Sequence, residues 1–263
     1  MISKFSHIAL TFFFVTLIGW STNSTEWIVK KYQYYSLYYT MADEKNIDDY
    51  NRFIVNGIAS VQNFFDANYK KSFNVYVHPN RTSLDSQWQK DWSMPGFKSE
   101  CWMVASGVSD KLDMLSPGLW DKESCEHHYA DKVKTQQLIT HELVHVYHGQ
   151  LNASPDFSDA IGIDWFVEGL ATYASGQCDS IRIVEVKKAI EENNIPISLD
   201  KFWTGKLKYG LSGSIVMFID HKYGRSKLKE LLPFHRNTEI LTALNTAEPA
   251  LLNDWKIYIE SGN

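Results

Sequence analysis

The sequence contains only three cysteines among its 263 residues, and no two of them form a Cys-x-x-Cys pair. A zinc site built from thiolates is therefore not expected. The sequence also lacks long basic runs, internal repeats and low-complexity segments, and its net charge is −5. Without a basic stretch there is no electrostatic footprint for a nucleic acid, so we expect no nucleic-acid partner.

The N-terminal apolar run, residues 8–18, is shorter than the roughly 20 residues that a membrane-spanning helix needs. Lys4 precedes it and Gly19-Trp20-Ser21 follow it, which is typical of a secretory signal peptide. We predict that residues 1–21 form such a signal and that residues 22–263 are secreted or periplasmic. An uncleaved N-terminal anchor is the alternative, because Trp20 would suit a membrane interface, and only then would the protein contact a membrane.

Export to an oxidising compartment favours a disulfide between Cys101 and Cys125, which flank a stretch rich in Gly, Ser and Asp. Cys178 would then be unpaired. The sequence also permits the other two pairings, and nothing in it chooses among the three.

Apolar periodicity suggests strands early in the chain and helices late in it. Strands are expected over residues 73–77, 101–106 and 111–115. Helices are expected over residues 44–69, 131–148 (ended by Gly149), 164–174, 181–194, 209–223, 226–232 and within 237–260. Residues 80–100 are expected to form a loop. This order predicts an α+β fold with one domain over residues 22–263, made of an upper lobe at about 44–150 and a helical lower lobe at about 151–263.

The clearest motif is His141-Glu142-Leu143-Val144-His145 in the helix predicted over residues 131–148. A spacing of four places both imidazoles on one helix face, where their Nε2 atoms can bind one zinc at roughly 2.0–2.1 Å. Glu142 lies about 100° further around the helix. Its carboxylate can therefore stand beside the metal and act as a general base on zinc-bound water.

A catalytic zinc takes three protein ligands and keeps a fourth position open. Glu168 is the best candidate for the third ligand, because it is an acid within the otherwise apolar residues 165–171. An unpaired buried carboxylate is costly, so it needs a cation or metal as partner. His141, His145 and Glu168 are therefore predicted to bind one Zn²⁺.

Together, His141-Glu142-x-x-His145 and the later Trp-Phe-Val-Glu168-Gly-Leu-Ala-x-Tyr resemble the gluzincin metallopeptidases, in particular their aminopeptidase-like branch. The resemblance covers about residues 131–176. It implies a thermolysin-like zincin fold, with a small mixed sheet above the metal helix and a helical lobe below. It also implies the same three zinc ligands, Glu142 as general base, and a peptide or protein as substrate.

More weakly, the resemblance extends to Tyr209-Gly210-x-Ser212-Gly213-Ser214, where such enzymes place a Tyr that stabilises the oxyanion. Tyr209 fits this role by position, and Tyr173 is its competitor. Where thermolysin has an Asp four residues after its ligand Glu, this chain has Thr172. The acceptor that orients a His ligand must then come from elsewhere. No exopeptidase loop is recognisable, so endopeptidase and exopeptidase activity both stay open, as does the oligomeric state.

Three other histidines offer an alternative from another class of protein. If His148, His127 or His128 supplied a fourth ligand, the zinc would be structural, and the chain a secreted binding module with a structural or vestigial site. Glu142 argues against this alternative, because a structural site has no use for a general base. We predict a zinc-dependent hydrolase of peptide bonds. Residues 102–106 are a candidate edge strand for pairing with an extended peptide, with a plain core strand as the alternative.

Overall fold

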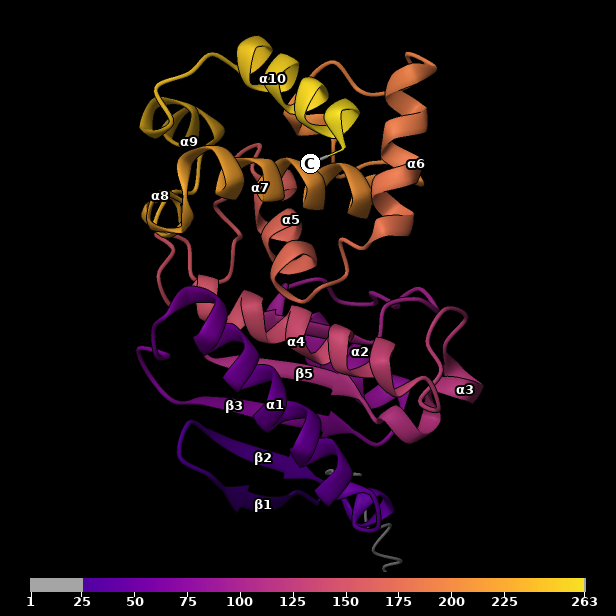
Figure 1. Cartoon of the computed structure of the whole chain (residues 1–263). Helices are drawn as coiled ribbons and strands as arrows, with labels where there is room; N and C mark the ends of the chain where they lie inside the picture. Colours follow the sequence, from indigo (N-terminus) through magenta and orange to yellow (C-terminus); the bar gives the residue numbers. More distant parts are fainter. Residues whose placement is uncertain (1–25, 263) are drawn as a thin grey trace, which may run out of the picture.

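The computed structural model describes residues 26–262, and the predicted signal segment 1–21 lies outside them. Figure 1 shows two lobes, one built on a sheet and one made of helices. We call residues 28–149 the sheet lobe and residues 150–262 the helical lobe. The predicted α+β class, with a small mixed sheet followed by a helical C-terminal part, is confirmed. Within residues 26–262, no helix is both long enough and apolar enough to cross a membrane.

The sheet has five strands in the order β1-β2-β3-β5-β4. They are β1 (Ile28–Lys31), β2 (Tyr35–Tyr39), β3 (Phe73–His78), β4 (Ala105–Val108) and β5 (Lys111–Leu115). The three inner strands are parallel, and each edge strand is antiparallel to its neighbour. The sequence did not reveal β1 and β2. In β2, two tyrosines and a leucine form the buried side, so the sheet lobe begins well before the predicted residue 44.

Two long helices, α1 (Ile47–Phe65) and α4 (Lys132–Gly149), pack together over one face of the sheet. The prediction that Gly149 lies just beyond the end of α4 is wrong, because Gly149 is the last helical residue and Gln150 caps the helix. A Cβ at Gly149 would lie 2.5 Å from the Pro155 carbonyl oxygen and 2.8 Å from the Ser109 nitrogen. Glycine is therefore needed there for close backbone contact.

The expected loop at residues 80–100 instead contains α2 (Arg81–Asp91). Asn80 caps it by accepting a hydrogen bond from the Ser83 nitrogen at 2.8 Å. Only Leu84 and Trp88 are buried on this helix, so its sequence shows little amphipathic periodicity. Both belong to a second, smaller hydrophobic core beside β5.

The strand expected over residues 101–106 begins only at Ala105, because Cys101 and Trp102 lie in a turn. The Cys101–Cys125 disulfide is confirmed, and Cys178 is free. The disulfide ties this turn to the segment after α3 (Trp120–Glu123). The Arg81 guanidinium adds hydrogen bonds to carbonyl oxygens on both sides of the disulfide, including those of Met103 and Glu123.

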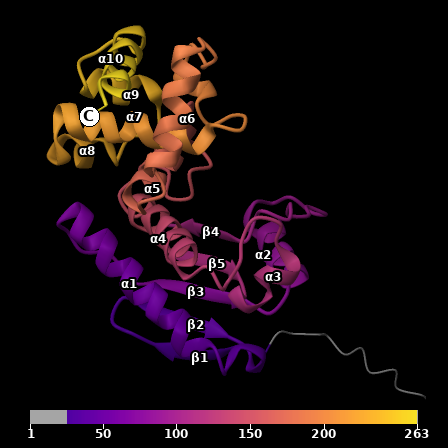
Figure 2. The ribbon, with the colours of Figure 1, turned by 45° about the vertical axis from the view of Figure 1, so that its right-hand side comes forward.

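The helical lobe contains the later helices that the sequence predicts. These are α5 (Asp164–Ala174), α6 (Ser180–Glu191), α7 (Lys208–Tyr223), α8 (Arg225–Leu231), α9 (Asn237–Ala243) and α10 (Glu248–Ser261). Pro249 lies in the first turn of α10, where its missing N–H costs no helical hydrogen bond. Helix α5 packs against α4 on one side and α7 on the other, so it joins the two lobes (Figure 2).

One continuous hydrophobic core runs through both lobes. It includes Leu37 and Val75 in the sheet, Leu143 on α4, Phe166 on α5 and Ile215 on α7, all fully buried. Buried residues of α4 and α5 are part of this core. The packing therefore holds both helices in place, together with the side chains that project from their other faces.

Candidate metal centre

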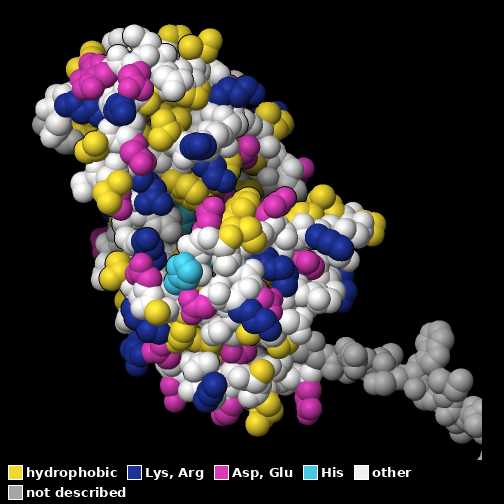
Figure 3. Space-filling view, turned by 90° about the vertical axis from the view of Figure 1, so that its right-hand side faces the viewer, with side chains coloured by type: hydrophobic (Ala, Val, Ile, Leu, Met, Phe, Trp, Pro, Cys, Tyr) yellow, Lys and Arg dark blue, Asp and Glu magenta, His cyan; other side chains and the backbone are white. Residues whose placement is uncertain are grey.

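Three side chains converge where α4 meets α5. His141 and His145 come from α4 and Glu168 from α5, and their candidate ligand atoms all lie within 4.8 Å of one another. This is the one group of three or more such residues found within residues 26–262. The surface is hollowed between the two lobes, and acidic and hydrophobic side chains gather beside the hollow (Figure 3).

The spacing of the three ligand atoms fits one small cation. The two Nε2 atoms are 3.0 Å apart, and the Glu168 Oε2 is 3.3 Å from the Nε2 of His141 and 3.6 Å from that of His145. Around a tetrahedral ion with ligand distances of roughly 2.0–2.1 Å, two ligand atoms lie about 3.3 Å apart. The three side chains are thus placed to bind one metal ion without rearrangement.

A hydrogen bond fixes the orientation of one imidazole. His141 Nδ1 lies 2.9 Å from the Gln177 side-chain oxygen, so Nδ1–H donates and Nε2 is left free to bind a metal. Gly176, with φ +76°, turns the chain after α5 and brings Gln177 back toward α4. Gln177 is thus the hydrogen-bond acceptor for a histidine ligand that the sequence analysis could not identify. The only signal for it in the sequence is its position directly after the turn-forming Gly176. The Nδ1 of His145 is buried without a partner among the described residues.

The charge of Glu168 is stabilised by its two histidine neighbours. Burial alone would raise the pKa of its carboxyl group, but His145 and His141 outweigh that effect and hold the pKa well below its usual value. Glu168 is therefore ionised, as a metal ligand must be.

Glu142 shares α4 with the two histidines but is not one of the clustered ligands. Burial raises the pKa of Glu142 to about 7, with the nearby His141 opposing the shift and the negative charge of Glu168 adding to it. Edge strand β4 passes close to this residue, because a Cβ at Gly107 would lie 2.2 Å from the Glu142 carbonyl oxygen. A carboxyl group with a pKa near neutrality is well suited to accept and return a proton.

The group formed by His141, His145 and Glu168 opens into a cleft of about 510 Å³ between the lobes. On the sheet side it is lined by residues 102–108, which include β4. An edge strand and a plain core strand were the two alternatives for residues 102–106, and the sheet order places β4 at the edge, although the regular strand begins only at Ala105. Phe157, Arg182, Trp203 and Tyr209 line the cleft from the helical side.

The two candidate tyrosines are placed differently. Tyr209, in the first turn of α7, lines the cleft together with Glu142 and Glu168. Burial raises its pKa, and these two carboxylates raise it further, so its phenol keeps its proton. The hydroxyl of Tyr173 instead donates to the Asp220 carboxylate at 2.9 Å, and Tyr173 is not among the residues that line the cleft.

None of the three other histidines joins the cluster. His127 Nε2 lies 3.1 Å from the Trp102 carbonyl oxygen, and His128 pairs with Asp121. His148 is fully buried, and its Nε2 donates to the Leu232 carbonyl oxygen at 3.1 Å. Within residues 26–262, therefore, no fourth protein ligand closes the site.

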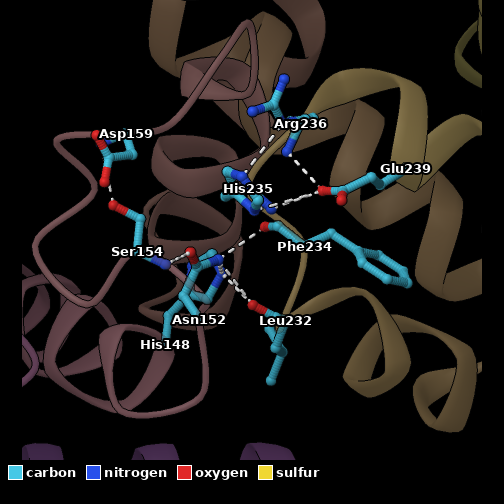
Figure 4. Close-up of polar contacts among 9 residues, drawn as sticks. All are labelled: His148, Asn152, Ser154, Asp159, Leu232, Phe234, His235, Arg236 and Glu239. Carbon is cyan, nitrogen blue, oxygen red and sulfur yellow. Dashed lines mark hydrogen bonds and ion pairs between the residues drawn. The ribbon is translucent and has the colours of Figure 1, made fainter.

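His148 belongs to a polar junction between the end of α4 and the segment after α8 (Figure 4). Asn152 donates from Nδ2 to the carbonyl oxygens of Leu232 at 2.8 Å and Phe234 at 2.7 Å. Burial, with a smaller contribution from His145, lowers the pKa of His148 to about 3. This junction holds the lobes together around a neutral histidine.

This buried histidine predicts a pH effect on stability. In the unfolded chain His148 binds a proton near its ordinary pKa of 6.5, whereas in the folded chain it does not until about pH 3. Stability should therefore be lost as the pH falls through this window. Urea unfolding at about pH 7 and about pH 5 should show a smaller loss for His148→Gln than for the unchanged protein. Equal losses would contradict the assignment, since the two proteins differ only at residue 148.

A larger hollow, of about 1220 Å³, lies at the end of β3 and is lined in part by His78, Ser83 and Thr40. His78 is hydrogen-bonded on both ring nitrogens, to Asp113 at 2.8 Å and to Ser83 at 3.0 Å. None of the three clustered candidate ligands lines this hollow, so the candidate metal site belongs to the cleft between the lobes.

The sequence matches no protein-family model and no curated protein at a significant level. The geometry of the site is therefore the basis for a proposed function.

Proposed function

We propose that this protein is an exported zinc-dependent hydrolase of peptide bonds, of the gluzincin type and with a thermolysin-like zincin fold. The observation that carries the proposal is the convergence of His141, His145 and Glu168 at tetrahedral ligand spacing, with Glu142 beside them. Two imidazoles and one carboxylate are a common ligand set of catalytic zinc. The Cys101–Cys125 disulfide supports export, because such bonds persist in oxidising compartments.

Zinc held by these three side chains would supply Lewis acidity toward water and toward a substrate carbonyl group. Within residues 26–262 no fourth protein ligand occupies the position that substrate needs. This arrangement favours catalysis over the alternative of a binding module with a structural site, because structural zinc is enclosed by four protein ligands.

The protein's own side chains would carry the protons. Glu142 takes a proton from the attacking water and passes it to the leaving amine, a role that its pKa near 7 suits. Tyr209 faces the same space and stays protonated, so its hydroxyl can donate a hydrogen bond to the oxyanion.

An extended peptide is the substrate that the cleft favours. Edge strand β4 pairs with β5 on one side only, and its residues line the cleft beside the three candidate metal ligands. The backbone groups on its other edge can therefore bind a peptide by adding a strand to the sheet. This alignment would bring one carbonyl of the peptide toward Glu142.

The test is to measure metal content and peptide cleavage on the same purified protein. We expect about one zinc per chain by elemental analysis, and cleavage of an unbiased peptide library detected by mass spectrometry. Chelation should abolish cleavage, and added zinc should restore it. Absence of zinc after metal has been offered, or a zinc-loaded protein that cleaves no peptide, would overturn the proposal.

A further inference from the structure

Aromatic rings from both lobes surround one ammonium group at the rim of the cleft. The Nζ of Lys208, the first residue of α7, lies 4.5 Å from the ring centroid of Trp102, 4.7 Å from that of Trp203 and 5.2 Å from that of Tyr209. The rings of Trp203 and Tyr209 are perpendicular, with centroids 4.8 Å apart and an interplanar angle of 88°. They form two walls, and Trp102 from the sheet lobe forms the third. We call these three rings the aromatic cage.

Within the described part of the chain, the Lys208 ammonium group contacts three aromatic rings and no negative charge. Among residues 26–262 it has no carboxylate or hydrogen-bond partner, so the faces of the three rings hold its charge. Each ring carries negative charge on its face, which attracts a cation within about 6 Å. The cage therefore binds an alkylammonium group, and Lys208 is the group that it binds in this structure.

The cage is also part of the proposed active site. All three of its rings line the cleft, and Tyr209 faces both the cage and the carboxylates of Glu142 and Glu168. Glu126 lines the cleft from the sheet lobe and adds negative charge near Tyr209, and the Arg182 guanidinium lies 5.5 Å from the Tyr209 ring centroid. The carboxylates near Tyr209 outnumber this guanidinium, so a ligand in the cage would share the cleft with the reacting peptide bond in surroundings that favour a cation.

Lys208 itself is a poor permanent occupant. It is only partly buried, and a lysine side chain regains rotamer freedom when its ammonium group returns to solvent. A ligand that brings its own ammonium group can displace Lys208 and make the same ring contacts.

We propose that the aromatic cage is a subsite for the side chain of a substrate lysine next to the scissile bond, and that Lys208 occupies this subsite until substrate arrives. In so far as it names a substrate, this inference rests on the proposed peptidase function. Lys208 then acts as a tethered competitor, so its removal should strengthen lysine binding.

The first test compares two peptide substrates that differ only in lysine or norleucine beside the cleaved bond. The wild type should prefer the lysine peptide in kcat/KM, and Lys208→Met should raise this preference about tenfold, which corresponds to about 1.4 kcal/mol. Trp203→Leu should bring the preference close to one. Lys206→Met, a change of the same kind at an exposed lysine nearby, should leave it unchanged.

A second test needs no catalysis. Full-length Lys208→Met is titrated with N-acetyl-lysine amide and with N-acetyl-norleucine amide, and the tryptophan indole resonances are followed by NMR. The lysine compound alone should shift the signals of Trp102 and Trp203. Peptide cleavage with equal preference in all variants and no such shifts would overturn the cage while leaving the peptidase proposal standing. Shifts without any peptide cleavage would support the cage and overturn the peptidase.

Discussion

Replacing Glu142 with glutamine is expected to lower kcat for peptide hydrolysis roughly a hundredfold to ten-thousandfold while zinc stays bound. Glutamine has nearly the same shape as glutamate and fits the same buried position, but it cannot accept a proton. The three clustered ligands do not include Glu142, so the metal should be retained. This combination distinguishes a general base from a metal ligand, because loss of a ligand would remove both zinc and activity.

Steady-state kinetics and elemental zinc analysis on the same preparation measure both effects. Glu191→Gln, at the exposed end of α6, makes the same chemical change away from the cleft and should match the wild type in both. Turnover of Glu142→Gln near the wild-type rate would remove Glu142 from the mechanism. Loss of zinc would instead mean that its carboxyl group helps to hold the metal.

Local spacing explains why the core of the site was predictable. His141 and His145 are four residues apart on one helix, so their meeting follows from helix geometry alone. Glu168 was found because a lone acid in an apolar segment needs a partner, and the structure places it against both imidazoles. Only the side-by-side packing of α4 and α5 had to be supplied by the fold.

The parts that the sequence did not reveal depend on contacts between distant residues. Gln177 orients His141 only because the chain turns back after α5. Trp102 and Trp203 meet at Lys208 from different lobes, and no spacing rule connects them. Strand β2 and helix α2 were missed for a different reason. The first buries tyrosines and the second buries only two side chains, so neither gives a clear periodic signal.

Glu168→Ala is expected to remove zinc from the protein, lowering its zinc affinity by more than about a hundredfold, since even loss of a residue that only orients a ligand costs about ten- to a hundredfold. Without this carboxylate, two neutral imidazoles remain, with Nε2 atoms 3.0 Å apart, and no negative charge balances the ion. Zinc content should therefore fall from about one per chain to near zero, and peptide cleavage should fall with it.

Elemental analysis after gel filtration measures this loss, and Glu191→Ala is the matched control at an exposed position. The variant should remain folded by circular dichroism, because α5 keeps its buried Phe166 and Leu170 and loses only a residue at the edge of the cleft. A folded Glu168→Ala protein that still bound one zinc would mean that another side chain supplies the third ligand. Protein groups could then close the site, and this result would support the alternative of a binding module with a structural zinc.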